Sequence, residues 1–154
     1  MKRGRLRFSL VLCISLAVVL MMVGGAMAKI PGGYRDVKLG MNKTQVLDLL
    51  EKNRTHYSYD DVGQEIREIV RGDDLFRYAT YSFNNEGVLV QIGLQMREIL
   101  GRDKVLQLYN SQHGLSVSPK HSTVESNMCI EVRDNALVMK MLSNGDKRSA
   151  QRTK

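Results

Sequence analysis

The clearest hydrophobic pattern in the chain predicts a helix in LGMNKTQVLDLL, residues 39–50. Val46, Leu49 and Leu50 stand at i, i+3 and i+4, which is the spacing of one helical face. Charged residues follow, and the apolar stripe stops before Asn53. The pattern therefore predicts one amphipathic helix that ends near Asn53.

The residues before this stripe predict where the helix begins. Asn42 is a favoured N-cap, and Gln45 follows three residues later, as in a capping box. Met41 can pack on Val46, which is the arrangement of a hydrophobic staple. Because each of these residues has a structural role, the motif needs no catalytic function to explain it.

The middle of the chain predicts an antiparallel hairpin with one buried face. Residues 75–83, LFRYATYSF, are rich in aromatic side chains, and NNEG at 84–87 is a turn with a glycine available for positive φ. Apolar residues then alternate at Val88, Val90, Ile92, Leu94 and Met96. Residues 64–70, QEIREIV, fit either a strand or a short helical turn.

A second helix is expected after this hairpin. Asp103 can cap its start, and Val105, Leu108 and Tyr109 form its apolar stripe. Gly114 is a natural residue to end it.

A second hairpin completes the pattern. Its alternating residues are Met128, Ile130 and Val132 on one strand and Leu137, Met139 and Met141 on the other. Asp134-Asn135 is the turn between them. From the stripes and the alternating faces we expect these residues to be largely buried: Leu49, Leu108, Val90, Ile92, Ile130 and Leu137.

The two predicted helices begin with similar sequences. Leu39-Gly40 matches Leu100-Gly101, Asn42-Lys43 matches Asp103-Lys104, and Val46-Leu47 with Leu49 matches Val105-Leu106 with Leu108. Either two amphipathic helices are alike by chance, or a helix-plus-hairpin unit was duplicated. The predicted fold is α+β, in the order helix, strands, helix, hairpin, with two helices on one face of an antiparallel sheet.

The predicted domain organisation is simple. One α+β domain covers residues 37–142. Residues 29–36 form a flexible lead-in, because Pro31 and two glycines discourage regular structure. Residues 143–154 form a disordered basic tail.

The first 28 residues have the parts of a secretory signal peptide. Basic MKRGRLR precedes the apolar run FSLVLCISLAVVLMMV, and Ala26 and Ala28 form an A-x-A cleavage signal. We therefore expect cleavage before Lys29 and export to the periplasm. The alternative is an uncleaved inner-membrane anchor over residues 8–28, because that stretch contains no charge.

The formal net charge of +7 belongs mainly to the two ends of the chain. Residues 1–28 and the C-terminal KRSAQRTK are basic and contain no acidic residue, while the chain between them is close to neutral. The sequence therefore predicts no nucleic-acid partner.

Cysteine and histidine show no catalytic or metal-binding pattern. Cys13 lies in the apolar run, and Cys129 has apolar neighbours that predict a buried, unreactive thiol, with an intermolecular disulfide as the alternative. His56, His113 and His121 lack the spacing of metal ligands. His113 precedes the predicted helix end, where a cation interacts favourably with the helix dipole.

The acidic pairs Asp60-Asp61 and Asp73-Asp74 are interpreted as solvated turn residues. The chain also has no phosphate-binding glycine loop, nucleophile elbow or nucleotide fingerprint. We therefore predict no catalytic residue, metal, cofactor or small-molecule substrate.

Tyr57, Tyr59, Asp60 and Asp61 occur together in THYSYDDVG, directly after the first helix. Exposed tyrosines beside acids make a good protein-contact surface, because the ring buries area at low entropic cost. These four residues are the candidate partner-binding site. The alternative is that Tyr57 or Tyr59 closes the end of the core.

DVKLGMNKTQVLDLL, residues 36–50, resembles the segment that opens the SmpA/OmlA (BamE-like) domain of bacterial envelope proteins. Both have a hydrophobic residue, Gly-Met, a small polar residue, and then Val and Leu-Leu at helical spacing. The β-lactamase-inhibitor-protein fold is a duplicated relative with a similar layout. Here Leu-Leu-Glu-Lys-Asn replaces the Leu-Gly-x-Pro that usually closes the family helix. The cysteine typical of lipoprotein members is also missing.

The resemblance implies an exported, non-catalytic interaction module of the bacterial cell envelope, with another envelope protein as its partner in assembly or scaffolding. One alternative is an inhibitor that inserts a loop, 57–63 or 115–125, into the cleft of a hydrolase. Another is an enzyme whose type the motifs do not identify.

Overall fold

The computed structural model describes residues 30–52 and 58–143. The predicted signal peptide with its cleavage residues, His56, Tyr57 and all but the first residue of the predicted tail lie outside these ranges. The described elements form an α+β fold with the following bounds: β1 Gly33–Tyr34, β2 Val37–Lys38, α2 Lys43–Lys52, β3 Ser58–Val62, β4 Glu65–Ile69, β5 Phe76–Phe83, β6 Leu89–Met96, a 3-10 turn η1 Glu98–Leu100, α3 Arg102–His113, β7 Thr123–Glu125, β8 Met128–Arg133 and β9 Ala136–Met141.

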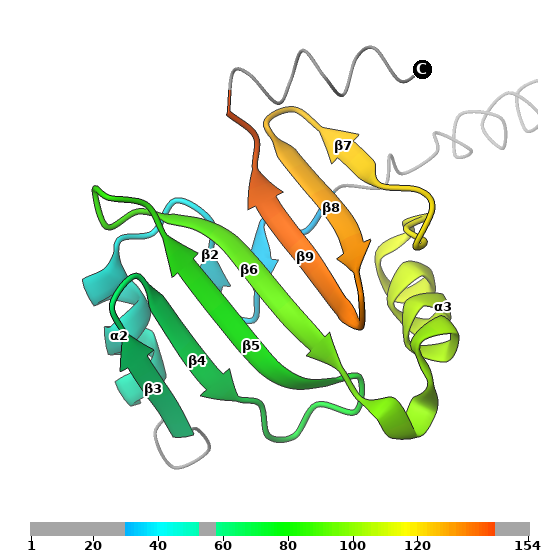
Figure 1. The fold of residues 1–154 in the computed structure, drawn as a ribbon, viewed down its shortest axis with the longest axis horizontal. Coiled ribbons are helices and arrows are strands. Elements are labelled where there is room, and N and C mark those ends of the chain that lie inside the picture. The colour runs from blue at the N-terminus through cyan, green and yellow to red at the C-terminus, as the bar shows by residue number, and fades with distance from the viewer. Residues whose placement is uncertain (1–29, 53–57, 144–154) are drawn as a thin grey trace, which may run out of the picture.

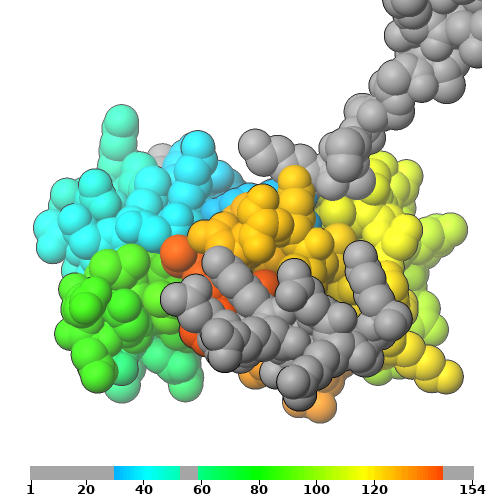
Figure 2. All heavy atoms as spheres, turned by 90° about the horizontal axis from the view of Figure 1, so that it is seen from above, coloured from blue at the N-terminus to red at the C-terminus, as the bar shows by residue number. Residues whose placement is uncertain are grey.

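The main sheet has seven strands in the order β3-β4-β5-β6-β9-β8-β7, and every neighbouring pair is antiparallel (Figure 1). Two meanders meet where β6 pairs with β9. Seen from above, the cyan segments of α2 and the β1–β2 hairpin lie in a layer over the green strands (Figure 2). Within the described residues, no helix is both long enough and apolar enough to cross a membrane.

The strand register explains why one face of the sheet is buried. Ile66, Tyr81, Ile92, Met139 and Ile130 stand side by side across five strands, and all are almost fully buried. Side chains point to alternate faces along a strand, so this row defines the inner face. The same hydrophobic core contains Val46 and Leu50 from α2 and Val105, Leu106 and Tyr109 from α3.

The start of α2 has the predicted capping box. The backbone N–H of Gln45 donates to the Asn42 side-chain oxygen at 2.9 Å, and the Gln45 side-chain oxygen accepts from the Asn42 N–H at 2.9 Å. The helix ends at Lys52, next to the predicted end. Asn42 and Gln45 therefore satisfy two backbone groups that the helix itself cannot pair.

Replacing Asn42 with Ala should lower the free energy of unfolding by about 0.5–2 kcal/mol, because free backbone N–H groups lose their acceptor. Thermal and urea melts would measure the change, and binding of any partner should persist at temperatures where the domain is folded. Thr44→Ala, an exposed change in the same first turn, is the matched control and should leave the melt unchanged. Equal melts for Asn42→Ala and the wild type would show that the cap contributes nothing.

The β5–β6 hairpin and its turn are confirmed, but the predicted phase of β6 is wrong at its start. Gln91 pairs with Ser82 and Leu89 pairs with Phe83, so the pairing skips Val90. This bulge turns Leu89 inward, fully buried, and leaves Val90 half-buried. A strict alternation in the sequence cannot reveal such an insertion.

The β8–β9 hairpin is confirmed, with Asp134 at φ 50° in its turn. Of the predicted core residues, Ile92, Ile130 and Leu137 are fully buried. Leu49 is half-buried and packs against the core.

The second helix differs from its prediction in two ways. Its N-cap is Gly101, at φ 72°, so Asp103 lies in the first turn and is not the cap. Leu108 is 40% exposed, whereas Leu106 is buried. Val105, Leu106 and Tyr109 form the buried face of α3, and Leu108 lies at the edge of that face. The predicted end is confirmed, because Gly114 takes the left-handed conformation.

Residues 64–70 form a strand, β4, and pair on both sides. The first helix is therefore followed by four strands and not by a single hairpin, so the prediction of two equal helix-plus-hairpin units is wrong in this respect. Hydrophobic residues at 66, 69 and 70 fit a helical face, and those at 66 and 70 also fit one face of a strand, so only the pairing with neighbouring strands selects between the two.

The predicted lead-in contains regular structure. Gly33 and Tyr34 pair with Lys38 and Val37 in a small hairpin. A Cβ on Gly33 would lie 2.1 Å from the Val37 carbonyl oxygen, so this close approach requires glycine. Ile30 and Tyr34 are both buried. The prediction of a flexible lead-in is therefore wrong for Gly33 and Tyr34, where glycine permits a tight hairpin.

Candidate functional site

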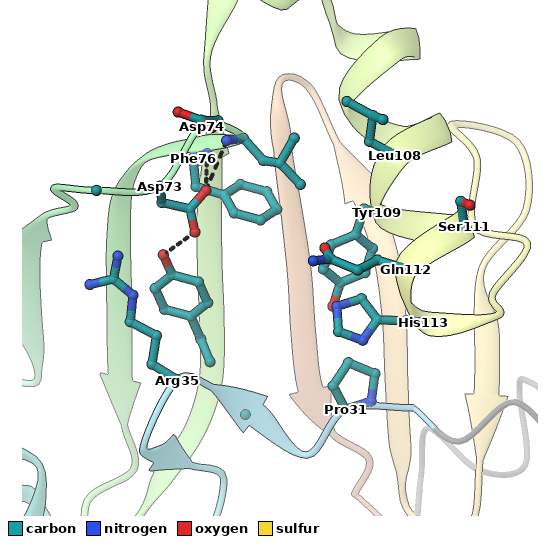
Figure 3. Close-up of a pocket in the computed structure, with 14 residues that line it drawn as sticks. Pro31, Arg35, Asp73, Asp74, Phe76, Leu108, Tyr109, Ser111, Gln112 and His113 are labelled. Carbon is teal, nitrogen blue, oxygen red and sulfur yellow. Dashed lines mark hydrogen bonds between the residues drawn. The ribbon is translucent and has the colours of Figure 1, made fainter.

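An open groove of about 700 Å³ lies between α3, the β1–β2 hairpin and the connection from β4 to β5 (Figure 3). In Figure 3, Leu108, Tyr109 and His113 line it from the helix, and Arg35 and Asp73 from the other side. The groove therefore joins segments that are far apart in the sequence.

Aromatic rings form the floor of the groove. Phe76 of β5 makes edge-to-face contacts with Tyr34 at 6.0 Å and with Tyr109 at 5.8 Å between ring centroids. The His113 ring lies 4.4 Å from that of Tyr109, at the rim. Gly114 ends α3 directly after His113, so the helix stop places the imidazole at the mouth. The predicted position of His113 in the last helical turn is confirmed.

Asp73 organises the loop on the opposite wall. Its carboxylate accepts from the Tyr34 hydroxyl at 2.7 Å and from the backbone N–H groups of Leu75 and Phe76 at 2.8 and 3.1 Å. Its carbonyl accepts from Arg97 Nε at 2.9 Å. The interpretation of Asp73 as a solvated turn residue is therefore wrong, because it fixes the hairpin to β5. Asp74 is exposed, as expected.

Tyr34 and Arg35 form the wall between the groove and a small inner chamber, since both line each space. Burial raises the pKa of Tyr34 far above its ordinary value, and the hydrogen bond to Asp73 raises it further. Arg35 has φ 53°, an unusual conformation for a residue other than glycine. Its guanidinium lies 5.3 Å from the centre of the Tyr34 ring and donates to the Arg71 carbonyl at 2.8 Å.

Among residues 30–52 and 58–143, Glu68 is the one charged side chain that is buried, at 1% exposure. Tyr81 donates its hydroxyl to Glu68 Oε2 at 2.5 Å. Within the described part of the chain, Glu68 Oε1 has no hydrogen-bond partner, and Arg35 Nη1 lies 3.8 Å from it. Burial raises the pKa of Glu68, and this outweighs the lowering by the Tyr81 hydrogen bond and by Arg35. The chamber beside it has a volume of about 20 Å³.

The sequence did contain a signal for Glu68. Ile66, Glu68 and Val70 alternate, so a strand assignment places the acid on the apolar face. Because the segment fits a helix equally well, the sequence alone does not predict that Glu68 is buried. The position of Tyr34 and Arg35 was missed because their segment was interpreted as a lead-in.

The residues predicted as the partner-binding loop lie in strand β3, apart from Tyr57, which falls outside the described residues. Tyr59 and Asp61 point to the side of α2, where the Tyr59 hydroxyl donates to Glu51 and Asp61 pairs with Lys43 at 2.6 Å. Asp60, between them, points to the opposite face. The structure thus places Tyr59 and Asp61 on one side of β3 and Asp60 on the other; their role in binding stays a prediction.

Cys129 and His121 lie away from the groove. Cys129 is a buried free thiol in β8, and burial raises its pKa, which disfavours the reactive thiolate. His121 is exposed in the loop before β7. The residues that the structure describes contain no group of three or more histidine, cysteine or acidic side chains placed to hold a metal ion.

The chain matches no protein-family model, no curated protein and no solved structure.

Proposed function

We propose that this protein is an exported, non-catalytic interaction module of the bacterial cell envelope. Its partner is another envelope protein, and a segment of that partner lies in the groove between α3 and the β1–β2 hairpin. The observation that carries this proposal is the groove itself, which is open, lined by aromatic rings and edged by polar groups.

The groove has the size and lining of a binding site. Its volume of about 700 Å³ lies in the range of ligand-binding clefts. Leu108 is 40% exposed at its edge and would be covered by a bound segment. Arg35 and Asp74 place both charge signs on the rim, which favours a polypeptide segment over a ligand of a single charge sign.

The hydrogen bonding supports binding more than catalysis. The Asp73 carboxylate already accepts three hydrogen bonds from the protein, and one of these occupies the Tyr34 hydroxyl. Three of the roughly four acceptor positions of this carboxylate are therefore occupied, which leaves little capacity to take a proton from a substrate. These two groups therefore serve as supports for the groove wall.

We also propose that both helices lie on one face of the sheet, as in the SmpA/OmlA domain that residues 36–50 resemble. Periplasmic localisation rests on the signal-peptide pattern of residues 1–28.

The inhibitor alternative has less support. Residues 58–62 form an edge strand, whereas an inhibitory loop should project from the fold. In 115–125, Leu115 and Val117 are buried, and the Asn110 side chain holds the backbone of Val117 through two hydrogen bonds. We therefore do not propose that either segment enters an enzyme cleft.

Leu108→Glu should reduce recovery of the partner from envelope extracts by at least about tenfold, because the bound segment would cover a charge at the edge of the groove. The measurement is affinity purification of the tagged full chain, with the bound protein identified and quantified. Val124→Glu is the matched control and should bind normally, because Val124 is an apolar residue of similar exposure on β7. Melts of both variants would confirm that they fold.

A third variant tests the tyrosine segment. Changing Tyr57 and Tyr59 together to Ser should leave binding intact if the groove is the contact. Loss of the partner with this variant, but not with Leu108→Glu, would contradict the groove proposal. A partner hydrolase that loses activity on binding would show instead that the protein is an inhibitor.

A further inference from the structure

The groove wall is attached to the sheet through a buried acid. Tyr34 and Arg35 face the groove on one side and the Glu68 chamber on the other. Glu68 lies on the inner face of β4, opposite Tyr59 of β3 and Ala79 of β5. A change in the charge of Glu68 therefore acts on Arg35 at the hairpin tip as well as on the hydrogen-bonded Tyr81 hydroxyl.

The contact between Arg35 and Glu68 is electrostatic and not a direct hydrogen bond. Arg35 Nη1 and Glu68 Oε1 are 3.8 Å apart, beyond the 2.7–2.9 Å typical of charge-assisted hydrogen bonds. A guanidinium attracts a carboxylate at this distance but gains little from a neutral carboxyl. The strength of the contact thus depends on whether Glu68 is ionised.

Among the described residues, no other group that lines the chamber around Glu68 is a cation that could take the place of Arg35. Tyr81 donates to the opposite oxygen, Oε2. Asp36 lines the chamber from the hairpin, and the hydroxyl of Tyr59 is bound to Glu51 of α2. From α2, the chamber is lined by Leu49 and Leu50, which are apolar. Arg35 is the cation in this set, so it responds most directly to the charge of Glu68.

We propose that Arg35 and Glu68 form a pH-sensitive latch on the groove wall. When Glu68 is ionised, the latch adds to the contacts that Tyr34 makes with Asp73 and Arg35 with Arg71, and when Glu68 is protonated it is lost, so the hairpin tip is held less firmly against the sheet. The shape of the groove then depends on pH. This inference rests on the proposed function only in what the groove is used for, because the latch itself is a property of the free protein.

The latch and the global fold should respond to pH in opposite directions. Burial raises the pKa of Glu68 in the folded state, so the fold favours the neutral carboxyl. That contribution to stability is full at acid pH and is lost as pH rises through the folded pKa. Acidification therefore stabilises the domain while it loosens Arg35. If Glu68 had a purely structural role, a change of pH would strengthen or weaken the global stability and the hairpin contact together.

The test is hydrogen exchange of the free protein, followed at the Leu39 amide. This N–H donates to the Gly32 carbonyl at 2.9 Å and reports opening of the hairpin. At pH 7, Glu68→Gln should exchange about two- to fivefold faster at Leu39 than the wild type and melt at a higher temperature. Glu65→Gln, on the same strand but the opposite face, is the matched control and should change neither.

Arg35→Met provides a second route to the same result, should Glu68→Gln fail to fold. After correction for intrinsic rates, the wild type should open more readily at pH 5 than at pH 8, and Arg35→Met should show no such dependence. Wild-type exchange at Leu39 that is independent of pH would overturn the latch, whatever the binding experiments show. A pH-dependent Leu39 with no groove partner would contradict only the proposed function.

Discussion

Leu94→Ala should lower the free energy of unfolding by about 2–5 kcal/mol, because it removes a fully buried side chain and leaves a cavity in a packed interior. Leu94 lies in the second inner row of the sheet, between Ala79 and Leu137. Urea titration followed by circular dichroism would give the value, provided that the slope of the transition matches that of the wild type.

Leu108→Ala is the matched control for this experiment. Sequence pattern alone predicts a similar loss at Leu108, but the structure leaves it 40% exposed at the groove. We therefore expect a loss of about 1 kcal/mol or less. Equal losses at the two positions would show that α3 faces the sheet in a different orientation from the one described.

Tyr81→Phe should lower the free energy of unfolding by about 1–3 kcal/mol at neutral pH, because Glu68 Oε2 loses the hydroxyl that donates to it. Both side chains are almost fully buried, so water cannot readily replace the donor. Melts over a range of pH would measure the loss.

The pH dependence of this variant has a definite sign. The Tyr81 hydroxyl lowers the pKa of Glu68, so its removal should raise that pKa above the already raised value of the wild type. The loss of stability should therefore shrink as pH falls and Glu68 becomes neutral in both proteins. Tyr78→Phe, on the exposed face of the same strand, should change stability by less than about 0.5 kcal/mol at every pH. If the loss of stability in Tyr81→Phe did not vary with pH, the hydroxyl would not act through the charge of Glu68.

The sequence by itself determined the local structure wherever one pattern had one interpretation. Asn42 and Gln45 define the start of α2 because their side chains bond backbone groups only three residues away. Gly114 ends α3, and the two hairpins follow from alternation across turn residues. These features depend on interactions between residues a few positions apart, so the sequence shows both partners together.

Tertiary structure alone decided the features that depend on distant neighbours. The bulge at Val90 and the orientation of Leu108 follow from how β6 and α3 meet the rest of the core. The strand identity of residues 65–69 was settled by pairing with β3 and β5, since its own pattern fitted two periods.

The candidate site belongs to the second group. Arg35 lies 33 positions before Glu68 in the sequence, and Tyr34 lies 39 before Asp73, yet each pair is in contact. Pro31 and the two glycines after it suggested an unstructured lead-in, because these residues disfavour long helices and strands. The structure has only a short two-stranded hairpin there, which such residues permit. The composition of a loop indicates only which backbone conformations it can adopt. The groove and its buried acid form because packing against the sheet selects one of those conformations.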